Sequence, residues 1–522
     1  MKKSFLNICL IASLGLGITS CENRLDIAKH GNMGSLESFY QTNEEADQAL
    51  ASLYLSFRSL HYNWYLVKNL LSDDSWCGGG SRGDNADLEK LNEYTFGIDH
   101  SNIQSLYSGL YNLIYNACLI TDKVEPNTTE KKRCVAEAKF FRAFAHFELV
   151  TLWGTAPVVD HLLATSEYRP TNSSTADLWA AVEKDLTEAI ESGVLPSKTD
   201  ANDAETGIRI TKETAEAYLG KAYLFQGKYA EAATMLGKVI SSKKYELYKG
   251  DYDQLLHAAN NNCCESILEA QMRNDSEQAM SQMTMEYIMT GWRSDKLSYS
   301  GQANNEIAQG TYGFLNPRKD LYDAFKEMEG ENGYRLNATI RTYDQLVNYG
   351  ITLLPGAFLY GNEGYFYWKN RPLKADLIKD FSGFQAFQYT NLRVMRYAEV
   401  LLMAAEAYLM SNDPTNALKC INEVRSRAKL NALTSVTLDD IKKEKRLELC
   451  NEGVRYQDLV RWGDAKSVLA NQGAKVPSLS TTGVVWPVTN LNYGFKDKNM
   501  LLPIPLKETE LNSNIQQNNG WN

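Results

Sequence analysis

Two pairs of carboxylates have the residue types that could hydrolyse a glycosidic bond. Asp73 and Asp74 are adjacent, and Glu448 and Glu452 lie four residues apart in a helical pattern among several arginines. Glycoside hydrolysis needs two carboxyl groups facing each other across a sugar at roughly 5–10 Å. Adjacent aspartates do not meet that need by themselves, and carboxylates among arginines are typical of a structural charge network. The acidic pairs therefore favour a protein without catalytic activity.

Two further signals for catalysis or metal binding are weak. Residues 79–83 match the pattern G-x-S-x-G, but a nucleophile elbow requires a strand before the serine and a helix after it. Here a Trp-Cys-Gly loop precedes the motif, without surrounding alternation of strands and helices, so a flexible glycine-rich loop is the better interpretation. The 6 histidines are scattered and no pair has metal-ligand spacing.

Aromatic residues in loops are a better signal, because a ring can stack on the apolar face of a sugar while polar side chains bind its hydroxyls. Rings cluster beside the loop at 70–89 and again within residues 290–370. Any one of them could equally belong to the core, but we expect at least one exposed platform in the set. The candidate ligand-binding residues are Trp64, Asp74, Trp76, Asn85, Trp292, Tyr299 and Trp368.

The N-terminus predicts export and a lipid anchor. Lys2 and Lys3 precede an apolar stretch at 5–18, and Ile18-Thr19-Ser20-Cys21 resembles a bacterial lipobox. We expect a signal peptide at 1–20, lipidation of Cys21 and a polar tether at 21–41. The alternative is ordinary cleavage nearby, for example after Gly17. Several acyl chains on one cysteine would give stable membrane attachment, whereas a single chain gives only marginal binding.

Composition narrows the possible partners and the cysteine chemistry. The net charge of -10, without a basic stripe, argues against a nucleic-acid partner. Seven cysteines follow Cys21, an odd number at irregular spacing, which does not fit a disulfide framework.

Hydrophobic periodicity predicts a mainly α fold built on helical hairpins that resemble tetratricopeptide repeats. Hairpins are expected at about 131–240 and 396–428, and within the latter Asp413-Pro414 caps and begins the second helix. Between them, about 260–390, periodicity weakens and glycines mix with aromatics, which predicts a long region of loops and short strands that carries the ligand site. Because neighbouring hairpins share one core, residues 42–522 are predicted to form a single domain.

Three C-terminal segments strongly resemble the SusD/RagB family. They are NLRVMRYAEVLLMAAEAY, IKKEKRLELCNEGVRYQDLVRWGDA and LLPIPLKETELNSNIQQNNGW. The lipobox, the first helices, the hairpins and the segment GFLNPRKDLYDAFKE occur in the order expected for that family, so the resemblance covers nearly the whole mature chain.

The resemblance implies a non-catalytic, lipid-anchored protein on the surface of the outer membrane. Such proteins capture an oligosaccharide, or in some members a peptide, and deliver it to a partner SusC-like TonB-dependent transporter. The family's helical hairpins are thought to face that transporter. The ligand groove is implied to lie in loops after the first helix and in the irregular region, here the stretches containing Trp76 and Trp292. Some members bind calcium, but this sequence has no compact cluster that indicates it, and no cofactor is expected. A peptide ligand, and less so a surface glycoside hydrolase, remain the alternatives.

Overall fold

The chain forms a mainly helical molecule in a computed structural model that describes residues 39–383, 385–489 and 492–521. The fold class predicted from the sequence is confirmed. The predicted signal peptide, Cys21 and nearly all of the tether lie outside the described residues, so these assignments and the single-domain division stay predictions. No helix in the described part of the chain is long and apolar enough to cross a membrane.

The N-terminal helices form the first layer of the core. The helix α2 begins with a capping box in which Thr42 accepts a hydrogen bond from the Glu45 amide. Leu50, Leu53 and Phe57 form its buried stripe and pack on the next two long helices. These helices are α2 (Asn43–Leu70), α4 (Ser101–Lys123) and α5 (Thr129–Trp153), with the short α3 (Ala86–Glu93) between them.

The predicted helical hairpins are both present. In the hairpin of α7 and α8, a Cβ on Gly220 would lie 2.7 Å from the Leu236 side chain, so the small residue permits a close approach of the two helices. In the second hairpin, Asp413 caps α16 by accepting from the Asn416 amide, and α15 packs against α7 and α8. The helices are α6 (Thr175–Glu191), α7 (Lys212–Phe225), α8 (Tyr229–Ser242), α15 (Tyr397–Met410) and α16 (Pro414–Arg427).

The region at 260–390 contains short strands as predicted, but also many short helices that weak periodicity did not reveal. It has a small core of its own, in which Trp292, Phe366 and Trp368 are buried. The strands are β2 (Ser266–Ala270), β3 (Leu297–Tyr299), β4 (Phe314–Pro317), β5 (Ile340–Thr342), β6 (Ile351–Leu353), β7 (Phe358–Tyr360) and β8 (Tyr365–Tyr367). The helices are α9 (Ala279–Gln282), α10 (Met285–Thr290), α11 (Gly301–Glu306), α12 (Lys319–Glu329), α13 (Tyr334–Thr339) and α14 (Tyr343–Tyr349).

Antiparallel pairs join segments that are distant in the sequence. The strand β1 (Ser75–Gly78) pairs with β4, β3 with β6, β5 with β8, and β2 with β9 (Leu392–Arg396). A three-stranded sheet has the order β11-β10-β7, with β10 (Lys475–Ser480) in the centre and β11 (Gly483–Thr489) at the edge. The remaining C-terminal helices are α17 (Leu438–Leu449), α18 (Arg455–Trp462), α19 (Ala465–Val468) and α20 (Leu506–Leu511).

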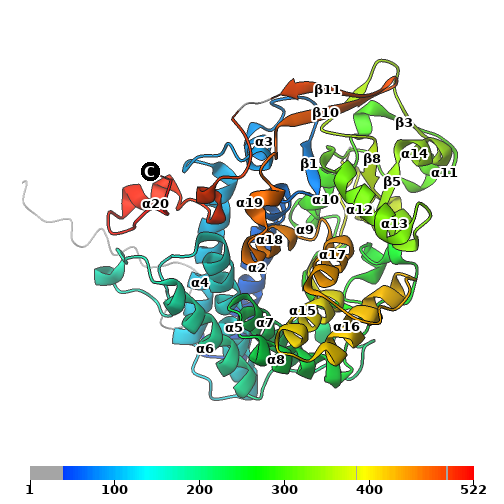
Figure 1. Ribbon diagram of the computed structural model, residues 1–522. Helices are drawn as coiled ribbons and strands as arrows, with labels where there is room; N and C mark the ends of the chain where they lie inside the picture. The colour runs from blue at the N-terminus through cyan, green and yellow to red at the C-terminus, as the bar shows by residue number, and fades with distance from the viewer. Residues whose placement is uncertain (1–38, 384, 490–491, 522) are drawn as a thin grey trace, which may run out of the picture.

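The loops and the hairpins occupy opposite ends of the molecule. In Figure 1, β1, α3, β10 and β11 lie at the upper end, whereas α8, α15 and α16 lie at the lower end. All described cysteines are free thiols, and Cys118, Cys134, Cys420 and Cys450 are buried as small apolar residues.

Candidate functional site

The first loop is held against the middle region by a close backbone approach. Gly78, at the end of β1, has φ +78°, and a Cβ there would lie 2.3 Å from the carbonyl oxygen of Gly313. The amide of Gly79 donates to that same carbonyl at 2.9 Å. Since only glycine permits this geometry, the glycine run fixes the loop at 79–84 beside residues 291–314.

Polar side chains from the two regions meet at this point. Oδ2 of Asp84 accepts a hydrogen bond from the Gly80 amide at 2.7 Å and lies 3.4 Å from Nη1 of Arg293. The Nε of Arg293 lies 2.7 Å from Oδ1 of Asp295. Asp84 and Asp295 are exposed, so this group presents carboxylate and guanidinium groups to solvent.

Arg82, in the same loop, is tied to α3 and to β7. Its Nη1 and Nη2 donate to the two carboxylate oxygens of Glu93, the second at 2.9 Å, and Nη1 lies 3.3 Å from the hydroxyl of Tyr360. The Nε lies 3.4 Å from Glu89. The hydrogen bond to Glu93 raises the pKa of Arg82, while burial raises the pKa of Tyr360 to about 12.

An exposed tryptophan on the edge strand β11 lies against β1, the strand that leads into this loop. The side chain of Trp486 is 45% exposed, and its ring centroid lies 6.0 Å from that of Trp76 in an edge-on arrangement. Trp76 is only 4% exposed; its Nε1 donates to Glu363 at 2.8 Å, and the guanidinium of Arg318 lies 4.0 Å from its ring centroid. Trp76 therefore packs beneath Trp486 and supports it. We call the surface of the loop 79–84, Arg293, Asp295 and Trp486 the rim surface.

Comparison with known proteins identifies the family of this chain. The model of the SusD family matches residues 264–521, and a second family model, described as starch-binding associating with outer membrane, matches residues 31–224. The chain belongs to the SusD family.

Relatives and solved structures agree with this membership over most of their length. The SusD-like protein of Bacteroides ovatus is 26% identical over 481 residues, covering 87% of this chain and 82% of the relative. The starch-binding protein SusD of Bacteroides thetaiotaomicron is 24% identical, covering 99% of both. The solved structure of a laminarin binding SusD-like protein is 28% identical, with a TM-score of 0.77 and coverage of 91% of this chain and 99% of that one. A surface glycan-binding protein A from Bacteroides fluxus is 25% identical, with a TM-score of 0.73 and coverage of 92% and 99%.

This SusD-family chain brings together the two predicted regions, but the predicted tryptophan rings are closed to solvent. Trp64 is 2% exposed in the helical core, with Nζ of Lys68 lying 3.9 Å from its ring centroid. Trp292 and Trp368 are each 3% exposed and stack on each other at 5.8 Å, and Tyr299 is half-buried at the edge of the same small core. The expected exposed platform is therefore not among them, because each ring fills a core. Their role as ligand contacts stays a prediction without support from exposure.

The two polar candidates have structural partners. Oδ1 of the buried Asp74 accepts from Nε of Arg446 at 2.8 Å, so this carboxylate forms an ion pair inside the protein. Asn85 caps α3 by accepting from the Leu88 amide at 3.2 Å, and it is half-buried beside the loop 79–84. Among the predicted residues, Asn85 is thus a partly exposed one that directly follows the loop of the rim surface.

Sequence patterns do not single out Trp486, because the tail after residue 476 shows no helical periodicity. The segment GVVWPVT is rich in β-branched residues and contains an aromatic residue, a composition that is typical of a strand. That signal could have placed an aromatic on a strand, but the ring on which Trp486 packs, Trp76 of β1, comes from a distant segment.

The second acidic pair forms the structural charge network expected from the sequence. Glu448 and Glu452 are buried around Arg396, whose Nε lies 2.7 Å from Glu452 and whose Nη2 lies 3.2 Å from Glu448. Burial alone would raise the pKa of Glu448, but Arg427, Arg396 and Arg335 lower it to about 2. Among the described residues, no group of three or more histidine, cysteine or acidic side chains is arranged to hold a metal ion.

Proposed function

We propose that this protein captures oligosaccharides at the cell surface and binds them on the rim surface. The observation that carries the proposal is the exposed ring of Trp486, which packs on Trp76 of β1, the strand that leads into the loop where Asp84 pairs with Arg293. A ring supplies an apolar platform for a sugar face, and carboxylate and guanidinium groups bind hydroxyls around it. The similarity to a laminarin binding SusD-like protein supports a glycan over a peptide ligand.

We further infer that the bound glycan is delivered to a SusC-like TonB-dependent transporter in the outer membrane. The helical hairpins lie at the end away from β11 (Figure 1), so a partner docked on them would leave the rim surface open. Lipidation at Cys21 would hold the protein at the membrane, and the family description as associating with outer membrane supports this location.

The proposed role is binding without catalysis. A glycosidase requires two carboxyl groups free to face a sugar. Asp73 is paired with Arg455 at 2.8 Å and Asp74 with Arg446 at 2.8 Å, while Glu448 and Glu452 are buried around arginines. The conspicuous acidic pairs are thus committed to ion pairs.

A binding panel tests this proposal. The full chain carrying Cys21→Ala, which prevents lipidation, is titrated by calorimetry against glucan, xylan and mannan oligosaccharides and against a set of peptides. We expect binding to at least one glycan, without new reducing ends after incubation. Binding to peptides alone, or release of reducing ends from a bound glycan, would contradict the proposal.

A further inference from the structure

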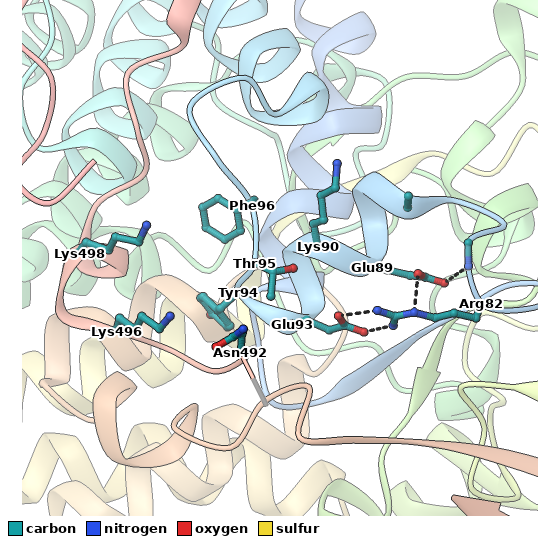
Figure 2. A pocket seen from close by; sticks show the side chains of 12 residues that line it. Arg82, Glu89, Lys90, Glu93, Tyr94, Thr95, Phe96, Asn492, Lys496 and Lys498 are labelled. Atoms are coloured by element: carbon teal, nitrogen blue, oxygen red, sulfur yellow. Dashed lines mark hydrogen bonds and ion pairs between the residues drawn. The ribbon is translucent and has the colours of Figure 1, made fainter. Parts of the chain in front are cut away.

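A pocket lies directly beside the rim surface, and Arg82 belongs to both. Its volume is about 580 Å³, and it is bounded by α3, the chain at 94–96 and the chain at 492–498. Figure 2 shows Arg82 with Glu89 and Glu93 on one side of this pocket and Lys496 and Lys498 on the other.

The two sides of the pocket differ in whether their positive side chains form ion pairs with carboxylates. On one side Arg82 faces two carboxylates, Glu93 and Glu89, which leaves one net negative charge there, and Lys90 lies 2.9 Å from the half-buried Asp87. By contrast, no carboxylate in the described part of the chain forms an ion pair with Lys496 or Lys498, and the neighbouring Asp497 is paired with Lys466 at 2.8 Å. The side of the pocket formed by Lys496 and Lys498 is therefore positive, on a chain whose net charge is -10.

Lys498 is held in place by aromatic rings. Its Nζ lies 4.0 Å from the ring centroid of Trp521, and that ring stacks on Phe96 at 5.2 Å. Burial lowers the pKa of Lys498, and the nearby positive charge of Lys496 lowers it further. Two neighbouring cations that repel each other, both directed toward the pocket in Figure 2, create a position where an anion would be stabilised.

We propose that this pocket binds the anionic group of an acidic oligosaccharide, either a uronate carboxylate or a sulfate ester, while a neighbouring sugar lies on the rim surface. This inference rests on the proposed function, because it names the class of glycan that the rim surface would take. Arg82 belongs to the loop 79–84 of the rim surface and also lines the pocket, so the two surfaces are continuous and one oligosaccharide could extend from one to the other. Hydrogen bonds from Lys496 and Lys498 to the anion would be charge-assisted and stronger than those to a neutral hydroxyl.

The test compares neutral oligosaccharides with matched derivatives that carry uronate or sulfate groups. The full Cys21→Ala chain and its Lys496→Gln/Lys498→Gln variant are titrated with each pair at low and high salt. The control variant, Lys123→Gln/Lys132→Gln, makes the same charge change on two exposed lysines of α4 and α5. Carboxylated and sulfated ligands are measured separately, and inorganic sulfate is included as a competitor to distinguish a bound sugar from a free anion.

We expect the acidic ligand to bind about tenfold more tightly than the neutral one at low salt, an advantage of about 1.4 kcal/mol that falls as salt rises. The double variant should lose this preference and keep its affinity for the neutral ligand, and the control should keep both. Equal binding of neutral and acidic ligands, or a preference that survives in the double variant, would overturn the inference and leave the proposed function intact. If inorganic sulfate competes for the pocket as strongly as the sulfated sugar does, the pocket is a general anion site. That result would also overturn the inference. Absence of binding to every glycan would refute the proposed function, and this inference with it.

Discussion

At the residue scale, Trp76 and Trp486 are neighbouring rings with opposite exposure. Trp76 is 4% exposed and Trp486 is 45% exposed, although both are tryptophans beside the same loop. Residue type alone does not distinguish them, because a tryptophan serves equally well in a core and on a binding surface. What decides is whether neighbours cover the ring: Arg318, Glu363 and Trp486 cover Trp76.

Buried Glu286 makes stability depend on pH. It lies on α10 without an ion-pair partner in the described residues, and burial raises its pKa to about 7. The unfolded chain releases this proton near pH 4.5, earlier than the folded chain does, so stability should fall as pH rises from about 4.5 to 7. The full effect is up to about 3 kcal/mol above pH 7.

We therefore expect Glu286→Gln to raise the free energy of unfolding at pH 8 and to remove most of this pH dependence. Urea unfolding at pH 5, 6, 7 and 8 measures the free energy of unfolding and its dependence on pH. Glu277→Gln, at an exposed position nearby, is the control and should follow the unmodified chain. A Glu286→Gln curve parallel to that of the unmodified chain would rule out this account.

At the element scale, the charge network explains why the segment EGVRYQDLVRWG identifies the family without marking a ligand site. Arg396, at the junction of β9 and α15, reaches Glu448 of α17 and Glu452 just beyond it. Arg461 of α18 pairs with Glu406 of α15. These contacts join the second hairpin to the C-terminal helices, so the motif is structural.

Removing Arg396 should destabilise the fold strongly. Arg396→Met leaves Glu448 and Glu452 buried with fewer partners, which should lower the free energy of unfolding by about 3–5 kcal/mol. Arg273→Met is the matched control, because Arg273 forms an exposed pair with Asp275 and such pairs contribute about 0–1 kcal/mol. Chemical denaturation of both variants at pH 7 provides the measurement. A loss below about 1 kcal/mol in Arg396→Met would mean that the network is not required for stability.

Local patterns predicted the helices better than they predicted the site. The helix α16, which Asp413 caps, was predictable, because a cap, a proline and a 3.6-residue period are encoded within one short segment. The exposed ring of Trp486 and the lysine pair at 496 and 498 were not, because both lie in the tail and acquire their surroundings from distant segments. Such long-range contacts leave no periodic signal in the sequence. The first loop and the middle region meet at the pair of Asp84 and Arg293, and the binding of a ligand there stays a prediction.

At the scale of the whole molecule, the rim surface and the helical hairpins lie at opposite ends, which suits a protein that binds a ligand at one end and a partner at the other (Figure 1).

The attachment of the protein to the membrane has a separate test. Each buried methylene of a lipid chain contributes about 0.8 kcal/mol to membrane binding, so the acyl chains should dominate attachment. We expect Cys21→Ala to move the protein from the membrane fraction to the soluble fraction. Cys9→Ala, which leaves the lipobox intact, should stay with the membrane. Retention of Cys21→Ala in the membrane fraction would contradict lipidation at that residue.

The most direct measurement of the central claim is the affinity of Trp486→Ala for whichever glycan the unmodified chain binds. Loss of a stacked ring should weaken binding by about 1 kcal/mol, or roughly fivefold, and leave the unfolding temperature unchanged because the ring is exposed. Tyr168→Ala removes a ring that is 64% exposed between α5 and α6, and should bind as the unmodified chain does. Unchanged affinity in Trp486→Ala, or an equal loss in Tyr168→Ala, would show that the glycan does not lie on the rim surface.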